Sequence, residues 1–217
     1  MSTTSRLEQD QTVIQYREEV LEHRDAAKPI HPIILNRWSS RSYANESITD
    51  EQLYTVLEAA RWAPSASNAQ PWRFYIAKTQ EEKALFQQFI NPRNRLWSHK
   101  AAVFILVTSA KFNNEGNPQS SHAFDAGAAW ATLAFQASAL GLNTRAIGGY
   151  DREVARRLLT IPDDIELHAV ITLGVRGTIE ELDENFHEAE KPSPRKALEE
   201  SIMPITIPGQ YATENKE

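Results

Sequence analysis

The sequence predicts a mixed α and β fold arranged around one sheet. Three observations lead to this prediction. Helical and strand patterns alternate along the chain, some strand-like runs are apolar throughout, and no linker divides the 217 residues. A chain of this length is long enough to bury a substantial core.

Two helices are predicted from their N-terminal capping signals. Thr49 is followed three residues later by Gln52, which is a capping box, and Pro64 ends the apolar stripe that follows. Thr79 and Glu82 repeat the same signal and predict a second helix through about residue 89.

The longest helical pattern covers His122–Leu140 and is rich in alanine, and Gly141 follows it as a stop signal. Such a helix can pack closely against a helix of another subunit, or it can lie in the core of a monomer. Asp151 predicts the N-cap of a further helix, which runs to about Leu159.

Four strands are predicted between these helices. Two of them are continuous apolar runs, which indicates burial on both faces of the sheet. The strands are Trp72–Ala77, Ala101–Ser109, Thr144–Ile147 and Leu167–Leu173, and Lys111–Ser121 is a polar loop.

The two ends of the chain are predicted to be arms on a domain of residues 29–200. Residues 1–28 carry Val13, Tyr16 and Val20 at helical spacing, which suggests one weakly amphipathic helix. This arm is either solvated or packed on a partner. Residues 201–217 form a C-terminal extension in a region where prolines prevent long regular elements.

Composition excludes several classes of function. The net charge of -6 gives no basic footprint for nucleic acid, and the absence of cysteine removes disulfides and thiolate metal sites. No apolar run approaches the length of a membrane span, and the first ten residues do not resemble a signal peptide. The six histidines have no helical pairing, so no metal site is predicted, and we expect a cytoplasmic protein.

The first stretch with chemical content is Asn36–Tyr43. It contains Arg37 and Arg41, which would share one face in a helical turn. Two guanidiniums with interleaved hydroxyls suit a terminal phosphate. The alternative is the start of a surface helix with unrelated arginines.

The second stretch, Ala59–Phe74, breaks a helix at Pro64 and continues with small polar residues. Small side chains let a planar ligand approach the backbone, and the amides of Asn68 and Gln70 can both donate and accept. The alternative is a tight loop that satisfies its own backbone.

The third stretch, Leu140–Asp151, places Gly148 and Gly149 between a strand and a helix. A Gly-Gly pair exposes backbone N–H groups that can donate to a ring nitrogen. The alternative is a tight turn without a ligand.

Together, the three stretches resemble the FMN-dependent nitroreductase family from about Asn36 to Glu200. The Pro-Ser-x-x-Asn-x-Gln-Pro-Trp-Arg-Phe motif is complete in residues 64–74, and residues 141–151 match the family's Ile-Gly-Gly segment. Trp38 and Tyr43 depart from the family's Arg-Arg-Ser-x-Arg-x-Phe pattern, and Ala197 replaces a proline in the closing motif.

The resemblance implies an α+β, nitroreductase-like fold with a central, mixed, mostly antiparallel sheet flanked by helices. It further implies terminal arms that embrace a second subunit, so that FMN lies at a homodimer interface. The implied activity is an oxidoreductase that uses NAD(P)H to reduce a nitroaromatic, a quinone or a similar acceptor by ping-pong hydride transfer through flavin N5. The alternatives are reductive dehalogenation or flavin cleavage on the same fold, or an FMN-binding protein without turnover.

The resemblance also assigns residues to the cofactor. The FMN phosphate would be held by Arg37, Ser39, Arg41 and Arg195, and Trp38 is also assigned to the cofactor site. The ribityl chain and the ring would be contacted from the neighbouring subunit by Pro64, Ser65, Ala66, Ser67, Asn68 and Gln70. Residues Ile147, Gly148 and Gly149 would line the ring, with a backbone N–H near N5.

Substrate contacts are predicted only from aromatic residues near the motifs. Trp97 in an Asn91–Lys100 loop, Phe124 after the polar loop, and Tyr150 are the candidates, and plain packing is the alternative for each. Hydride transfer needs no side-chain acid or base, so no catalytic residue is predicted.

Overall fold

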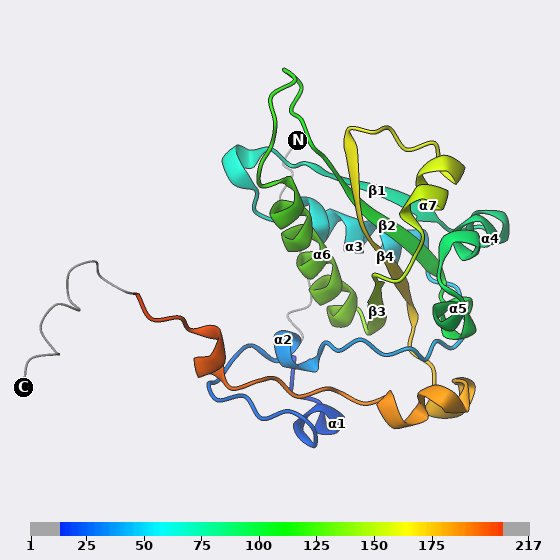
Figure 1. Ribbon diagram of the computed structural model, residues 1–217. Coiled ribbons are helices and arrows are strands. Elements are labelled where there is room, and N and C mark those ends of the chain that lie inside the picture. The colour runs from blue at the N-terminus through cyan, green and yellow to red at the C-terminus, as the bar shows by residue number, and fades with distance from the viewer. Residues whose placement is uncertain (1–13, 206–217) are drawn as a thin grey trace, which may run out of the picture.

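A four-stranded antiparallel sheet with helices on both faces forms the centre of the molecule (Figure 1). The structure is a computed structural model, and it describes residues 14–205. The strands β1 (Trp72–Ala77), β2 (Val103–Ala110), β3 (Leu142–Ile147) and β4 (Ile165–Val175) lie in the order β1-β2-β4-β3. Every pair of neighbouring strands is antiparallel, which confirms the predicted α+β class.

Strand β2 is buried along its whole length, as its apolar run predicts. Phe104 and Leu106 pack into the core on one face of the sheet, whereas Val103, Ile105 and Val107 pack into the core on the other. The alternation follows from the two-residue period of a strand, so one apolar run fills both cores.

The helices α3 (Asp50–Arg61) and α6 (His122–Ala139) cover one face of the sheet. The capping box of α3 is present: Thr49 Oγ1 accepts from the N–H of Gln52 at 3.1 Å, and Gln52 Oε1 accepts from the N–H of Thr49 at 2.9 Å. Helix α6 packs against α3 and the sheet of its own chain, and Gly141 follows it with a φ of 74°. The predicted capping box at Thr49 and the predicted stop signal at Gly141 are both confirmed.

The other face carries α4 (Gln80–Phe89), α5 (Pro92–Ser98) and α7 (Arg152–Leu158). The capping box at Thr79 and the N-cap at Asp151 are both confirmed. The prediction of a loop over Asn91–Lys100 is wrong, because α5 occupies this segment. Pro92 stands in the first turn of α5, where its fixed φ favours a helix, and Trp97 anchors the helix in the core.

Near the N-terminus, the described chain contains only the short helices α1 (Glu18–Leu21) and α2 (Pro32–Asn36). The single helix predicted over residues 1–28 is therefore wrong for its described part. Val20 is fully buried, and the N–H of Arg17 donates to Asn36 Oδ1 at 2.9 Å, so this segment packs on its own chain. Residues 1–13, with Val13, and residues 206–217 lie outside the described residues.

Beyond β4, the chain returns across the N-terminal segment through three short 3₁₀ helices, Ile179–Glu181, Glu184–Ala189 and Leu198–Ser201. We call residues 183–195 the C-terminal strap. The Glu190 carboxylate of the strap accepts from the backbone N–H of Arg41, and the Ser193 carbonyl accepts from Arg24 Nε at 3.0 Å. The strap thus fixes the segment that holds the first predicted motif (Figure 1).

Candidate functional site

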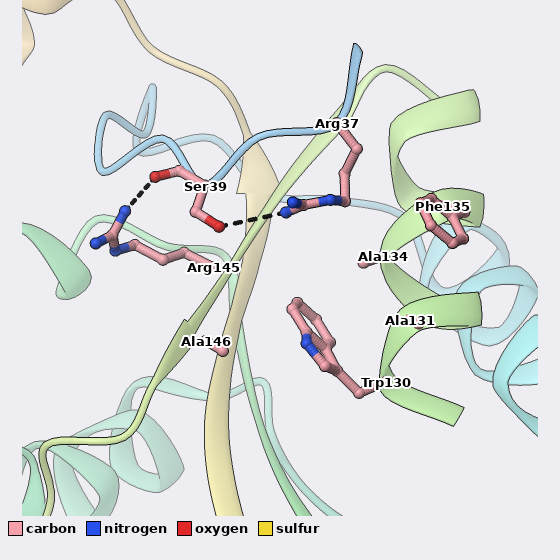
Figure 2. A pocket seen from close by; sticks show the side chains of 8 residues that line it. All are labelled: Arg37, Ser39, Trp130, Ala131, Ala134, Phe135, Arg145 and Ala146. Atoms are coloured by element: carbon pink, nitrogen blue, oxygen red, sulfur yellow. Dashed lines mark hydrogen bonds between the residues drawn. The ribbon is translucent and has the colours of Figure 1, made fainter. Parts of the chain in front are cut away.

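A cavity of about 340 Å³ lies between the segment after α2, strand β3 and helix α6 (Figure 2). Its polar part comes from Arg37, Ser39 and Arg145, and its apolar part includes the α6 side chains Trp130 and Phe135. The first and third predicted stretches therefore meet at this cavity.

Arg37 lies half-buried at the start of the site. Its guanidinium donates to Ser39 Oγ at 3.3 Å. Burial, and next the nearby charge of Arg195, lower the pKa of Arg37. Arg37 and Arg195 thus form a cationic group, and this group is open to solvent on one side because Arg195 is exposed.

The expected helical turn linking Arg37 and Arg41 is absent. Helix α2 ends at Asn36, and Arg37 already has extended backbone, with φ -70° and ψ 118°. The two guanidiniums therefore do not share a helical face, and Arg41 does not line the cavity.

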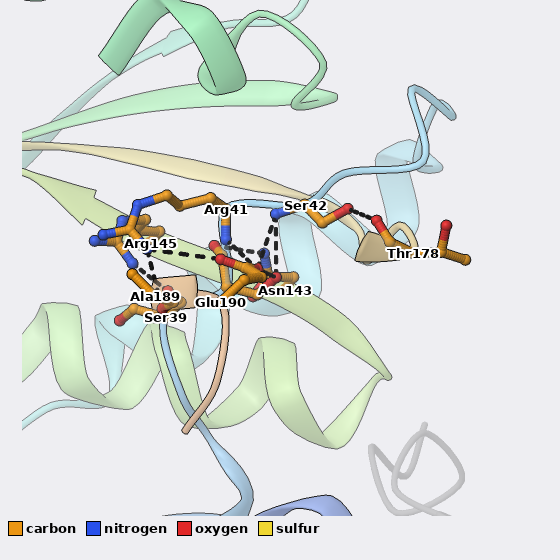
Figure 3. Close-up of polar contacts among 9 residues, drawn as sticks. Ser39, Arg41, Ser42, Asn143, Arg145, Thr178, Ala189 and Glu190 are labelled. Atoms are coloured by element: carbon orange, nitrogen blue, oxygen red, sulfur yellow. Dashed lines mark hydrogen bonds and ion pairs between the residues drawn. The ribbon is translucent and has the colours of Figure 1, made fainter. Parts of the chain in front are cut away.

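Arg41 instead faces Glu190 of the strap (Figure 3). Its Nη1 lies 3.6 Å from Glu190 Oε2, and the carboxylate side chain is only 4% exposed. The other carboxylate oxygen, Oε1, accepts from the Ser40 hydroxyl, from the N–H of Arg41 at 2.7 Å and from the N–H of Ser42 at 3.1 Å. Glu190 thus neutralises Arg41 and fixes the backbone of residues 40–42.

The sequence reasoning missed Arg145, which stands in the middle of β3. Its guanidinium donates to the Ser39 carbonyl and lies over the Trp97 ring at 5.5 Å. Burial, and next the charge of Arg41, lower the pKa of Arg145. A charged residue inside a predicted strand, within one of the three motif stretches, is the signal that could have identified it.

Two arginines of the site, Arg37 and Arg145, form no ion pair within residues 14–205. All ion pairs in this range use other cations, namely Arg41, Arg61, Lys78, Arg156, Arg176 and Lys196. Within the described chain, the guanidiniums of Arg37 and Arg145 each donate a hydrogen bond only to Ser39. A half-buried guanidinium without a carboxylate is stabilised by an anion, so this site fits a phosphate-bearing ligand such as FMN.

The second predicted stretch lies elsewhere in the described chain. Its loop contains the 3₁₀ turn Ala66–Asn68 and has positive φ values of 50°, 56° and 47° at Ser67, Asn68 and Gln70. Three such non-glycine residues store backbone strain, which is concentrated at functional sites in many proteins. The loop lines a separate cavity of about 420 Å³ with residues 112–121, not the cavity of Arg37.

Some groups of this loop are already used by the loop itself. Ser65 Oγ accepts from the N–H of Gln70 at 3.0 Å, and Gln70 Nε2 donates to the Asn68 carbonyl at 3.1 Å. The N–H of Ala66 donates to the buried Asp125 of α6 at 3.2 Å. The side chains of Ser67 and Asn68 remain exposed, as does Pro64.

The Gly-Gly turn follows β3 directly, and Ile147 before it is buried. A Cβ atom built at Gly148 would have open space around it. At Gly149 a Cβ atom would lie 3.0 Å from Asn91 Nδ2 and 3.1 Å from Asn94 Nδ2. Gly149 therefore permits the close approach of α5, whereas Gly148 leaves an open surface for a planar ligand.

The aromatic candidates differ in their access to a ligand. Trp97 is 1% exposed and stacks on Tyr43 in the core, which favours the alternative of plain packing over a substrate contact. Tyr150 is 6% exposed, whereas Phe124 is 82% exposed at the start of α6. Trp38 is buried beneath the Arg176 guanidinium, which lies 4.7 Å from its ring.

Two kinds of feature are absent from residues 14–205. This part of the chain contains no cluster of three or more side chains that could hold a metal ion. In the same range, no helix combines the length and the apolar character that crossing a membrane requires.

Comparison with known proteins decides the family. The model of the nitroreductase family matches residues 34–175. The chain belongs to the nitroreductase family. An Archaeoglobus fulgidus protein named "Putative NADH dehydrogenase/NAD(P)H nitroreductase" is 31% identical over 147 residues, which is 65% of this chain and 82% of that protein.

Solved structures of other proteins share the fold. A crystal structure described as an oxidoreductase containing FMN is 36% identical, with a TM-score of 0.78 over 88% of this chain and 97% of the other. A nitroreductase family protein of Clostridium difficile has a TM-score of 0.63 at 23% identity and covers 81% of this chain and 97% of its own. The second likeness supports the fold alone.

Proposed function

We propose that this chain is an FMN-dependent oxidoreductase that takes electrons from NAD(P)H and reduces an electron-poor acceptor, such as a nitroaromatic compound or a quinone. The observation that carries the proposal is Arg37, a half-buried cation that lines a cavity with Ser39 and has no carboxylate partner in the described chain. The FMN content of the similar crystal structure and the name of the archaeal relative agree with it.

In this proposal, Arg37 and Ser39 hold the phosphate of FMN, and Arg195 adds a solvent-exposed positive charge. Gly148 leaves room for the flavin ring beside β3, and buried Ile147 supports the turn from below. Bound FMN would supply the electron-transfer chemistry between NAD(P)H and the acceptor, which side chains alone do not provide. The protein contributes binding, orientation and electrostatics, without a side chain that acts as acid or base.

We further propose that the active form is a cytoplasmic homodimer, in which the loop of residues 64–70 contacts the FMN of the neighbouring subunit. Two features support this assignment. The loop lines a different cavity from Arg37 within its own chain, and its Ser67 and Asn68 side chains are exposed. A strained, exposed loop that lies apart from the Arg37 cavity of its own chain is a suitable contact for a second subunit.

The phosphate assignment is tested by comparing two flavins. Apo-protein is titrated with FMN and with riboflavin, which lacks the phosphate, and flavin fluorescence gives both dissociation constants. Arg37→Met should weaken FMN binding by at least about 30-fold, the effect of removing one partner of a buried charge pair, and should leave riboflavin binding nearly unchanged. Arg157→Met, at an exposed position of α7, is the matched control.

A wild-type protein that binds neither flavin contradicts the proposal. With FMN bound, anaerobic NAD(P)H should bleach the flavin absorbance, and a nitroaromatic or quinone should restore it. Parallel double-reciprocal lines are expected, because both substrates use the site in turn. A protein that binds FMN but is not bleached by NAD(P)H is a binding protein without turnover.

The shared site is tested by complementation between subunits. An Arg37→Met chain and an Asn68→Leu chain should each bind FMN poorly. Refolded together in equal amounts, they should recover about a quarter of the wild-type sites, because half of the dimers are mixed and each mixed dimer holds one intact site. If both groups act within one chain, the mixture recovers nothing.

A further inference from the structure

A second cavity, of about 420 Å³, lies where β1 begins and β2 ends (Figure 1). One wall belongs to the loop of residues 64–70, and the other belongs to the hairpin loop of residues 111–121 that follows β2. Trp72 and Ser109 are paired across the two strands, so both loops leave the sheet at the same end. No residue that lines this cavity also lines the cavity of Arg37. The second cavity is therefore separate from the site assigned to the FMN phosphate.

The hairpin loop is held in shape by contacts of its own. Phe112 and Pro118 form an antiparallel bridge. Asn113 Oδ1 accepts from the N–H groups of Glu115 and Asn117, at 3.0 and 2.9 Å. These contacts leave the Phe112 side chain 44% exposed at the cavity. An exposed aromatic ring on a preformed wall is a surface on which a nucleotide base can stack.

Of the described residues that line this cavity, Arg73 alone carries a charge. Its Nη1 donates to the Gln70 carbonyl at 3.1 Å and to the Trp72 carbonyl at 2.7 Å, which fixes the guanidinium beside the loop of residues 64–70. Arg73 forms no ion pair within residues 14–205. Its Nε and Nη2 groups are therefore available to donate to a phosphate, an anion whose geometry matches a guanidinium.

The remaining polar groups of the lining are neutral. Ser67, Asn114 and Ser120 are exposed, and their hydroxyl and amide groups can both donate to and accept from the hydroxyls of a sugar. The described lining contains no carboxylate that would repel a phosphate. An aromatic ring, a fixed cation and neutral donors and acceptors are the groups that recognise a base, a phosphate and a ribose. This combination suits a nucleotide.

The proposed function includes a substrate with such a nucleotide. In NAD(P)H, a pyrophosphate joins the nicotinamide half to an adenosine half. The nicotinamide half has to lie against the flavin to pass on its electrons, so the adenosine half binds beside the flavin. In the proposed dimer, the loop of residues 64–70 contacts the FMN of the neighbouring subunit, and the same loop forms one wall of the cavity. The cavity therefore lies next to the flavin that NAD(P)H reduces.

We infer that this cavity binds the adenosine half of NAD(P)H, with adenine on the Phe112 ring and a phosphate on Arg73. The inference rests on the proposed function and on its dimer. Arg37 then holds the phosphate of the cofactor, whereas Arg73 holds a phosphate of the reductant. NADH and NADPH share the pyrophosphate, and only NADPH carries a 2′-phosphate, so the test includes an arm for each of these two groups.

The first test measures nucleotide binding without turnover. FMN-loaded protein is titrated with 5′-AMP and with 2′,5′-ADP in a calorimeter. Arg73→Gln should weaken binding about 10-fold, the effect of losing a charge-assisted hydrogen bond. Phe112→Leu should weaken it by at least about 5-fold, because base stacking is lost. Arg157→Gln, at an exposed position of α7, is the matched control and should bind both nucleotides as wild type does.

The two nucleotides identify the phosphate. An equal loss for 5′-AMP and 2′,5′-ADP in Arg73→Gln assigns Arg73 to the pyrophosphate. A loss confined to 2′,5′-ADP assigns it to the 2′-phosphate, and the KM of NADPH should then rise while that of NADH does not. Adenosine, which has no phosphate, should bind to Arg73→Gln and to the wild type with the same affinity. A weaker affinity for adenosine in Arg73→Gln would contradict the role of Arg73 as a phosphate contact.

The second test compares NADPH with reduced nicotinamide mononucleotide, which lacks the adenosine half. The wild-type enzyme should have the lower KM for NADPH. Arg73→Gln should raise this KM about 10-fold with less than a twofold change in kcat, because the residue contacts no reacting atom. The KM values for the two reductants should therefore approach each other. A variant that lowers kcat at constant KM would contradict the inference.

The outcomes separate this inference from the proposed function. A wild-type protein whose bound FMN is reduced by neither NADH nor NADPH removes the proposed function itself. A wild-type enzyme that oxidises NADPH, paired with Arg73→Gln and Phe112→Leu variants of unchanged KM, overturns only the inference. Binding of 2′,5′-ADP without competition against NADPH would also overturn it. If Arg73→Gln does not fold, Phe112→Leu in the exposed hairpin loop still decides.

Discussion

Glu190→Gln should destabilise the fold by about 3 kcal/mol. The Glu190 side chain is 4% exposed, and its Oε1 atom accepts three hydrogen bonds, from Ser40, Arg41 and Ser42. A hydrogen bond to a charged acceptor contributes about 1 kcal/mol more than a neutral one, so three bonds lose about 3 kcal/mol when the amide replaces the carboxylate. This value lies at the lower edge of the cost of breaking a buried ion pair, about 3–5 kcal/mol.

The assay is urea unfolding at fixed protein concentration, supported by thermal melting. For a chain of this size, about 3 kcal/mol corresponds to a fall in Tm of about 6 to 12 °C. Glu188→Gln is the matched control, because Glu188 is exposed in the same strap, and it should change the unfolding free energy by less than about 0.5 kcal/mol. An equal, small effect of both variants would refute the reasoning that Glu190 fixes residues 40–42.

Three more predictions concern the fold. Burial lowers the pKa of His168 below its ordinary value of 6.5, so the unfolded state binds more protons than the folded state. The unfolding free energy should therefore fall as the pH drops from 7.5 toward 5.5, and it should fall less steeply in His168→Asn. An identical pH dependence of the two proteins counts against this prediction. Thr79→Ala removes the cap of α4 and should cost about 1 kcal/mol in urea unfolding, so an unchanged midpoint contradicts it. Gly149→Ala should destabilise the fold by about 1–3 kcal/mol and lower the Tm, because the added methyl group meets the Asn91 and Asn94 amides. Gly148→Ala has open space and should fold normally, and equal melting temperatures of the two variants would show the contact to be unimportant.

Local signals made much of the fold predictable. The capping residues Thr49, Thr79 and Asp151 act within three residues of themselves, and the apolar run of β2 reports its burial directly. Helix α5 was missed because seven residues are too few for a periodic pattern, and its stability comes from Trp97 in the core.

The candidate site was harder to predict because its contacts span the chain. Arg41 and Glu190 are in contact although they are 149 positions apart in the sequence, and Arg145 and Ser39 are in contact although they are 106 positions apart. No local sequence pattern indicates which of these arginines forms an ion pair with a carboxylate. The sequence therefore identified Arg37 and Arg41 as equals, whereas the structure gives them different surroundings.

The position of the strap has a consequence for biosynthesis. All four strands have been translated once Val175 leaves the ribosome, but Glu190 follows 15 residues later along the chain. A nascent chain at that stage has its complete sheet, yet the hydroxyl and amides of residues 40–42 still lack their acceptor. Residues 40–42 are therefore fixed last. A nonsense mutation just after the sheet would yield a product that has every strand but in which Glu190 is missing and the backbone of residues 40–42 is not held in place.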